Sequence, residues 1–248
     1  MSIQRMYGGA LAVLLLSLCA SATGAELVTN GTFEANGGVN TNSFSGWTVT
    51  DQAGGSGSWY AQSGTSPPGA FGSGLTVAAP PQGTFAAMTA QSGGGSHILS
   101  QNITIPAGAA AKFSAMVYVN NAAAAFSTPA TLDYTVNPNQ QFRIDVMTTA
   151  SPLTDMGAGI LLNVYQTKVG DPLVSGYVTV TADLSAFAGQ TVRLRFAEAD
   201  NQLYLSAGVD VVSVQTGSTA VPTLSQYALF ALAALLLGLG IVAARRRG

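Results

Sequence analysis

The chain has 248 residues, of which 48% are hydrophobic and only 8% are charged, and it carries a strongly apolar stretch near each end. Residues 26–214, between these stretches, hold eleven acidic residues against five basic ones, a formal charge of −6. An acidic surface argues against nucleic acid or anionic lipid as a partner, and it is compatible with neutral glycans and divalent cations.

The N-terminal segment has the composition of a secretory signal peptide. Arg5 supplies a basic start, residues 10–18 form a short apolar core, and a run of small residues follows. Cleavage after Ala22 or after Ala25 leaves a small residue at the last position in either case. We expect residues 1–25 to form a signal helix that directs the chain to the Sec translocon and is removed by signal peptidase.

The single cysteine, Cys19, lies within this segment. Removal of the signal peptide leaves the mature domain without a disulfide, a thiol nucleophile or a cysteine metal ligand. The domain must therefore be stabilised by burial of a core, with a bound metal ion as the remaining contribution.

Residues 26–214 are predicted to form one all-β domain, an antiparallel β-sandwich. Short apolar or alternating segments are separated by clusters of Gly, Pro, Asn and Ser, which is typical of this architecture. The expected strands span residues 27–33, 46–50, 58–62, 84–89, 97–105, 111–119, 141–147, 159–165, 174–183, 191–198 and 204–214. No long helical period occurs between them, so we expect almost no helix in this region.

Three of these segments place large apolar side chains at every second position, as half-buried antiparallel strands do. They are residues 111–119, 141–147 and 191–198. Glu198 lies on the inward face of the third segment, but its place at the strand end is expected to let it reach solvent.

Four short motifs follow one another along the domain. They are LVTNGTFE at 27–34, FSGWTV at 44–49, DLSAFAGQTVRLRF at 183–196 and GVDVVSV at 208–214. Their order resembles that of galactose-binding-like jelly rolls, the architecture of many carbohydrate-binding modules. The resemblance implies a jelly roll that interacts with extracellular polysaccharide. Residues 120–172 match it poorly and are expected to be a loop-rich elaboration.

The same resemblance implies a structural calcium ion, because the first and last strands of such jelly rolls lie side by side. The carboxylates of Glu34 and Asp210 then converge, and Thr32 could contribute its backbone carbonyl. An oxygen-rich site of this kind is what Ca²⁺ prefers. The alternative is that Glu34 caps a turn and Asp210 is merely exposed.

Sugar binding commonly uses exposed aromatic side chains, which cover the apolar face of a pyranose ring, together with polar groups around its hydroxyls. The candidates are Trp59 and Tyr60, in the Gly- and Ser-rich segment 54–64, and Tyr118 on the outward face of its predicted strand. For both Trp59 and Tyr118 a position in the core is the competing interpretation.

The domain offers little for catalysis. Its one histidine, His97, stands at the start of a predicted strand without an acidic neighbour in the sequence, and we expect it to be exposed. The sequence places no two carboxylates at the separation that glycoside hydrolysis requires. We therefore expect a protein that is not an enzyme, with a secreted hydrolase as the weakest alternative.

The C-terminal residues 221–248 combine three features, after a predicted linker at 215–220. A short motif comes first and consists of Val221, Pro222, Thr223, Leu224 and Ser225. The 18 residues Tyr227–Ala244 carry no charge and would span about 27 Å as a helix, so we expect a transmembrane helix over 225–244. A basic end follows and consists of Arg245, Arg246 and Arg247. These arginines indicate that the C-terminus stays in the cytoplasm and the domain lies outside.

This order of motif, helix and basic end resembles the IPTL-CTERM sorting signals of Gram-negative bacteria. Val221 replaces the usual Ile, and Gln226 and Tyr227 stand where an acidic residue and Trp are more common. The resemblance implies that an exosortase-like transpeptidase recognises and cuts the tail, whereas an ordinary single-pass anchor is the alternative.

Together these features predict an exported protein. We expect an intermediate anchored in the inner membrane, and then a protein of the cell surface or extracellular matrix. Its domain is expected to interact with polysaccharide. A purely structural adhesin or coat component without a glycan site is the alternative.

Overall fold

A computed structural model describes residues 24–69 and 76–217, together with the single positions Ala234 and Arg245. Residues 1–23 of the predicted signal peptide, the sorting motif, and the predicted membrane-spanning segment apart from Ala234 therefore lie outside the described residues. In the part of the chain that is described, no helix has the length and apolar character needed to cross a membrane. The domain itself contains one turn of 3₁₀ helix, η1 (Ser185–Phe187), and is otherwise built from strands.

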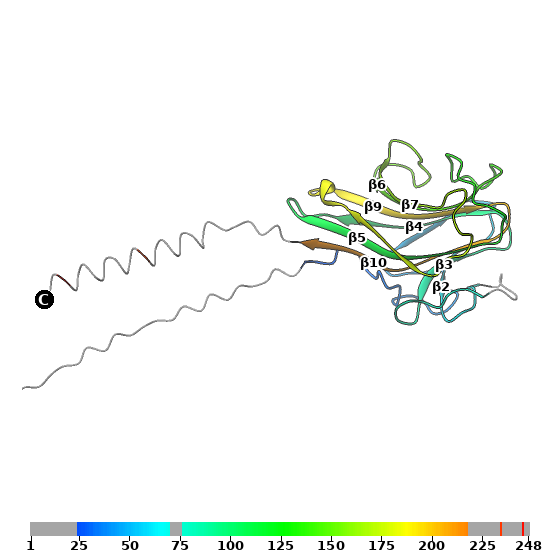
Figure 1. The fold of residues 1–248 in the computed structure, drawn as a ribbon, viewed down its shortest axis with the longest axis horizontal. Coiled ribbons are helices and arrows are strands. Elements are labelled where there is room, and N and C mark those ends of the chain that lie inside the picture. The colour runs from blue at the N-terminus through cyan, green and yellow to red at the C-terminus, as the bar shows by residue number, and fades with distance from the viewer. Residues whose placement is uncertain (1–23, 70–75, 218–233, 235–244, 246–248) are drawn as a thin grey trace, which may run out of the picture.

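Two five-stranded sheets pack face to face (Figure 1). The first sheet has the order β1 (Thr48–Asp51), β4 (Gly95–Thr104), β9 (Thr191–Asp200), β6 (Gln140–Thr148) and β7 (Ile160–Gln166). The second has the order β2 (Ser58–Gln62), β3 (Ala86–Ala90), β10 (Leu205–Gly217), β5 (Ala110–Asn121) and β8 (Val178–Asp183). Neighbouring strands are antiparallel throughout. The predicted all-β antiparallel sandwich is confirmed, and ten of the expected strands overlap these elements.

The first predicted strand, residues 27–33, is wrong. Asn30 and Phe33 have left-handed backbone angles, with φ of 52° and 56°. The Asn30 side chain also accepts a hydrogen bond from the backbone N–H of Ala35 and donates one to its carbonyl, both 3.0 Å long. Such local bonds compete with a strand ladder, so the chain turns here instead of extending.

The N-terminal segment nevertheless lies beside the last strand. The N–H of Leu27 donates to the carbonyl of Val214 at 3.0 Å, and the N–H of Thr216 donates to the carbonyl of Ala25 at 2.9 Å. β10 also continues through the first three residues of the predicted linker 215–220, so that boundary moves to the C-terminal side. Both ends of the described domain therefore meet at one end of β10 (Figure 1).

The main core lies between the sheets and is rich in aromatic side chains. Trp59 is fully buried and packs on Phe142, with 6.2 Å between the ring centroids. Trp47 packs on Phe33 and Phe196, at 5.3 and 5.7 Å. Burial of large rings supplies much of the stability that a domain without cysteine must obtain from its core.

Charged side chains are also buried, on the outer face of the first sheet. Asp145 accepts hydrogen bonds from Arg143 at 2.7 Å and from Arg195 at 2.6 Å, and Arg195 donates to the carbonyl of Asp155 at 2.7 Å. Sequence alone favours an exposed pair between Arg143 and Asp145, and this is wrong because the loop containing Asp155 folds over the strands. Burial alone would raise the pKa of Asp145, but the two guanidinium groups outweigh it and hold the pKa below its usual value.

Candidate functional site

The carboxylates of Glu34 and Asp210 lie beside the same loop. The N–H groups of Thr84 and Phe85 donate to Oε1 of Glu34 at 2.8 and 2.9 Å. The N–H of Gln82 donates to Oδ2 of Asp210 at 3.3 Å. The structure thus brings together the two acidic residues that sequence analysis assigned to one site, although a turn rather than a strand carries Glu34.

Asp210 is fully buried at an irregularity in the pairing of β10 with β5. The next residue, Val211, has φ of 51°, and its N–H donates to Oδ1 of Asp210 at 2.7 Å. Burial raises the pKa of Asp210 to about 7, and the negative charge of Glu34 adds to the rise. Asp210 is therefore a carboxyl group that lacks a compensating positive charge.

These residues fit a calcium ion in part. Two carboxylates supply charged oxygen ligands, and Thr32 lies half-buried in the same turn, two residues before Glu34. Within residues 24–69 and 76–217, no group of three His, Cys, Asp or Glu side chains is placed to hold a metal. Backbone carbonyls and water would therefore have to complete the six to eight oxygen ligands that Ca²⁺ takes.

The aromatic candidates for sugar binding are not on the surface as predicted. Trp59 is buried between the sheets. Tyr118 is buried beneath the loop that contains Ala78, and it packs on Tyr177 with 5.5 Å between ring centroids. Neither ring is the exposed platform that the prediction requires. Tyr60 is half-buried on β2.

A different site is formed where two strand connections meet. Residues 91–94, which join β3 to β4, and residues 200–204, which join β9 to β10, enclose a hollow of about 440 Å³. We call it the loop-end pocket. It lies at the start of β10, whereas both ends of the described domain lie at the end of that strand.

Two buried polar side chains form the floor of the loop-end pocket. The Gln91 amide donates to Oδ2 of Asp200 at 2.8 Å and to the carbonyl of Leu205 at 2.7 Å. The N–H of Gly95 donates to Oδ1 of Asp200 at 3.0 Å. Burial raises the pKa of Asp200 to about 6. The side-chain oxygen of Gln91 is also buried, and it accepts no hydrogen bond within the described part of the chain.

The rim of the loop-end pocket is less polar. Leu203 is 56% exposed, and Tyr204 is half-buried beside it. Asn201 is held in place, because its side chain accepts from the N–H of Asn139 at 2.8 Å and donates to the carbonyl of Val136 at 2.8 Å. The pocket thus combines a polar floor, a rim with both apolar and polar side chains, and a fixed connection.

Behind this floor lies a group of buried ionisable residues. Nδ1 of His97 is 2.8 Å from Oδ1 of Asp51, and His97 is only 1% exposed, so the prediction of an exposed histidine is wrong. Glu198 is 0% exposed, and the expectation that it reaches solvent is also wrong. Burial raises the pKa of Glu198 well above its usual value, and the charges of Asp200 and Asp51 add to this.

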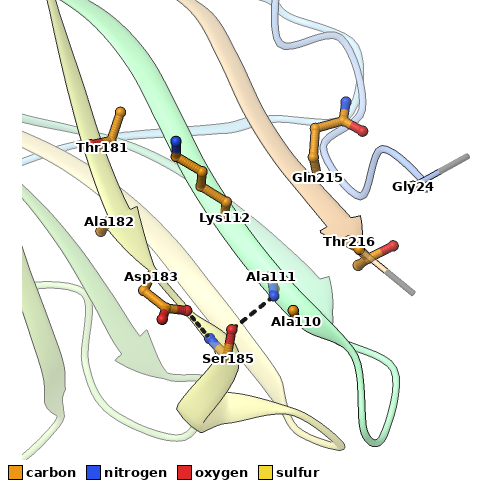
Figure 2. A pocket seen from close by; sticks show the side chains of 11 residues that line it. Gly24, Ala110, Ala111, Lys112, Thr181, Ala182, Asp183, Ser185, Gln215 and Thr216 are labelled. Carbon is orange, nitrogen blue, oxygen red and sulfur yellow. Dashed lines mark hydrogen bonds between the residues drawn. The ribbon is translucent and has the colours of Figure 1, made fainter. Parts of the chain in front are cut away.

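A second hollow, of about 720 Å³, lies at the other end of β10 (Figure 2). Lys112, on β5, and Gln215, on β10, line it, and none of its residues is aromatic. Oδ1 of Asp183 accepts from the N–H of Ser185 at 2.8 Å, and Oγ of Ser185 accepts from the N–H of Ala111 at 3.0 Å. Because polar groups here pair with one another, this hollow is a weaker candidate than the loop-end pocket.

The IPTL-CTERM motif matches residues 219–247 of the chain. The match confirms the predicted sorting signal. It indicates an exported, surface-directed protein that is a substrate of a sorting system. No curated protein matches the chain.

Several solved structures are similar to this chain at low sequence identity. The K3 cleaved adhesin domain of Lys-gingipain from Porphyromonas gingivalis W83 has a TM-score of 0.47 and 14% identity, with 79% of this chain and 99% of that chain covered. TmCBM61 in complex with β-1,4-galactotriose gives 0.46 and 12%, with 77% and 97% covered. A Stig cyclase, Fisc, from Fischerella sp. TAU gives 0.43 and 15%, with 78% and 98% covered. Similarity at this level assigns no activity to the chain.

The sequence does not predict the loop-end pocket. Gln91 and Asp200 are 109 residues apart, and neither stands in a recognisable motif. The run Gly93–Gly95 and the polar pair Asn201 and Gln202 do mark two turns between strands. They do not indicate that the two turns meet.

The raised pKa of Asp210 predicts a stability that depends on pH. The proton on Asp210 stabilises the folded state fully below about pH 4, and this contribution is lost as the pH rises through the folded pKa near 7. Between pH 4 and 7 in calcium-free buffer, we expect the wild type to lose on the order of 3 kcal/mol that Asp210→Asn does not lose. Urea unfolding at several pH values measures the difference. Parallel curves for the two proteins would contradict it.

Proposed function

We propose that this protein is a sorted surface protein whose sandwich domain interacts with neutral extracellular polysaccharide through the loop-end pocket. The observation that carries the proposal is the loop-end pocket itself, which places the polar Gln91–Asp200 pair at its floor and the side chains of Leu203 and Tyr204 at its rim. Sugar rings present hydroxyl donors at their edges and C–H groups on their faces, and such a pocket complements both.

The position of the loop-end pocket supports this role. β10 has 13 residues, and at about 3.3 Å per residue it is about 40 Å long. The loop-end pocket lies at its start, and the matched sorting motif follows its end in the sequence. A domain attached through its tail would therefore hold the pocket away from the point of attachment.

The charge of the site favours a neutral ligand. Asp200 is a carboxyl group at the floor of the pocket, and the domain as a whole is acidic. Bringing a uronic acid or sulfated sugar to this surface would juxtapose like charges, which is unfavourable. Neutral hexose polymers avoid this repulsion.

A purely structural role is the second candidate. The observation in its favour is the burial of Trp59 and Tyr118, so neither of these rings is the exposed aromatic platform that many glycan sites use. In both cases the domain acts by binding or assembly, and we propose no enzymatic activity.

For the ends of the chain we propose the route that the sequence suggests. The signal peptide delivers the chain to the Sec translocon and signal peptidase. The helix 225–244 then holds it in the inner membrane of a Gram-negative cell until an exosortase-like transpeptidase cuts near Val221–Ser225. The product reaches the cell surface or the extracellular matrix.

We also propose that Glu34 and Asp210 bind one structural Ca²⁺. The support is the convergence of two carboxylates on the loop 82–85, without a basic side chain among their hydrogen-bond partners. A divalent cation would offset the repulsion that raises the pKa of Asp210. It would tie the N-terminal turn to β10.

The glycan proposal is tested with the fragment 24–217 on an array of neutral and acidic polysaccharides. We expect binding to a neutral hexose polymer and none to uronate polymers. Tyr204→Ala should weaken this binding at least about tenfold, because the rim loses its apolar contact. Val169→Ala, an exposed change outside the pocket, is the matched control. A fragment that binds no glycan would leave the structural role as the answer.

The sorting proposal predicts a shortened protein. In a host with the matching transpeptidase, mass spectrometry of the mature surface pool should find a C-terminus within or beside Val221–Ser225. Pro222→Ala should reduce the processed fraction, because proline keeps the motif extended. Recovery of chains that still end in Arg245–Arg247 would show that the tail is a permanent anchor.

The calcium proposal predicts a shift in thermal stability. With Ca²⁺ at about 1,000 times its Kd, binding stabilises the folded state by about 4 kcal/mol, or about 10 °C for a domain of this size. We expect the fragment 24–217 to melt higher in Ca²⁺ than in EDTA, and Asp210→Asn and Glu34→Gln to remove the difference. Asp171→Asn should keep it. Equal melting temperatures for the wild type in both buffers would disprove the site.

A further inference from the structure

We propose that the line of residues Asp51, His97 and Glu198 holds the loop-end pocket closed in acid and releases its two connections as the pH rises. The opening itself follows from the structure of the domain. Only its consequence for sugar binding rests on the proposed function.

The line connects solvent with the core. Asp51, on β1, is 33% exposed at its side chain and accepts a hydrogen bond from Oγ of Ser58 at 2.8 Å. Its other oxygen is 2.8 Å from Nδ1 of His97, on β4. Nε2 of His97 is 4.0 Å from Oε2 of Glu198, on β9. Protons can therefore reach a fully buried carboxyl group along these side chains, with a small closure or a water bridging the last gap.

The bond to Asp51 sets the tautomer of the imidazole. A carboxylate accepts hydrogen bonds, so Nδ1 of neutral His97 carries the proton and the lone pair of Nε2 faces Glu198. A protonated Glu198 can donate to that lone pair. An ionised Glu198 has no proton to donate, and it faces this nitrogen without a bond.

The surroundings of Glu198 favour its neutral form. Both of its oxygens lack a hydrogen-bond partner within the described residues, as do Nε2 of His97 and Nε1 of Trp59. The ionisable groups that face Glu198 are Asp200 on its own strand, His97 on β4 and Asp51 on β1. From β6 its paired neighbour is the apolar Phe142, and the arginines of β6 and β9 lie on the opposite face of the sheet. A charged Glu198 would therefore be buried with two negative neighbours.

Ionisation of Glu198 acts on the pocket through Asp200. The two residues lie two positions apart on one face of β9, so their carboxylates repel each other in a buried setting. Asp200 is nearer the strand end and can gain solvent by giving up its bonds to Gly95 and Gln91. Those bonds tie the turn 91–94 to residues 200–204. Their loss opens the pocket.

The direction of the pH effect follows from the raised pKa values. Groups whose folded pKa lies above the unfolded value stabilise the folded arrangement at low pH, and the contribution is lost as the pH rises through the folded pKa. For Asp200 this is about pH 6, and for Glu198 it lies higher than its usual value. The closed arrangement should thus be most stable near pH 4, and it should lose stability as the pH rises through about 6 and through the raised pKa of Glu198.

Hydrogen exchange tests the opening without any sugar ligand. The full-length chain in non-ionic detergent is followed by mass spectrometry between pH 5 and 9, with rates corrected for intrinsic exchange. We expect the amides of Gly95 and Leu205, which donate to Asp200, to lose at least tenfold protection, while amides of β5 do not change. Glu198→Gln, which imitates the neutral acid, should abolish the loss, and Asp171→Asn should leave it intact.

Asp51→Asn provides a second test, which stays informative if Glu198→Gln does not fold. Asp51→Asn removes a negative neighbour of Glu198 near the surface, so the opening should shift to lower pH. Equal loss of protection in the wild type and in Glu198→Gln would overturn the proposal. So would a loss at Gly95 and Leu205 that the amides of β5 share to the same extent. An opening whose pH midpoint is the same in Asp51→Asn as in the wild type would also overturn it. A negative glycan array with pH-dependent opening would overturn only the proposed function.

Discussion

The hydrogen bonds that the Gln91 amide donates to Asp200 and Leu205 are the interaction on which the pocket end of this sandwich depends. Asp200 ends β9 in the first sheet, whereas Gln91 follows β3 in the second and also donates to Leu205 at the start of β10. One amide group therefore joins the two layers. It places the strand connections that enclose the loop-end pocket, and it seals the ionisable residues that lie behind the floor of that pocket.

The buried carboxyl groups of the domain differ in whether arginine side chains neutralise their charge. Asp145 lies between two arginines and stays ionised, because their charges compensate for lost hydration. Glu198, Asp200 and Asp210 are buried without an arginine or lysine partner, and burial raises the pKa of each. An uncompensated buried acid is unfavourable as an anion, so it must keep its proton, bind a cation or open to solvent. The proposed calcium site and the proposed opening of the loop-end pocket are two of these outcomes.

The sorting motif and the loop-end pocket stand at opposite ends of β10 along the chain. The sorting motif follows the end of β10, and the loop-end pocket lies at its start. The ends of the described domain and the loop-end pocket are thus separated by the length of β10. A surface protein gains from this separation, because attachment at one end leaves the other end free to contact extracellular material.

The sequence by itself determined the architecture and the destination of the protein. Alternation of apolar and polar residues, interrupted by turn residues, reports local geometry, and it located ten strands of the sandwich. The sorting signal is likewise a contiguous pattern and is recognised without structure. The one failed strand, residues 27–33, contains Asn30, whose side chain bonds its own turn.

Tertiary structure decided the site. Burial depends on what covers a face: Trp59 lies under the opposite sheet, Tyr118 lies under a loop, and His97 is paired with Asp51, 46 residues away. The floor of the loop-end pocket joins Gln91 and Asp200 across 109 residues. Local periodicity carries no information about such pairs, because they form only when the two sheets pack and exclude the water that would otherwise solvate these groups.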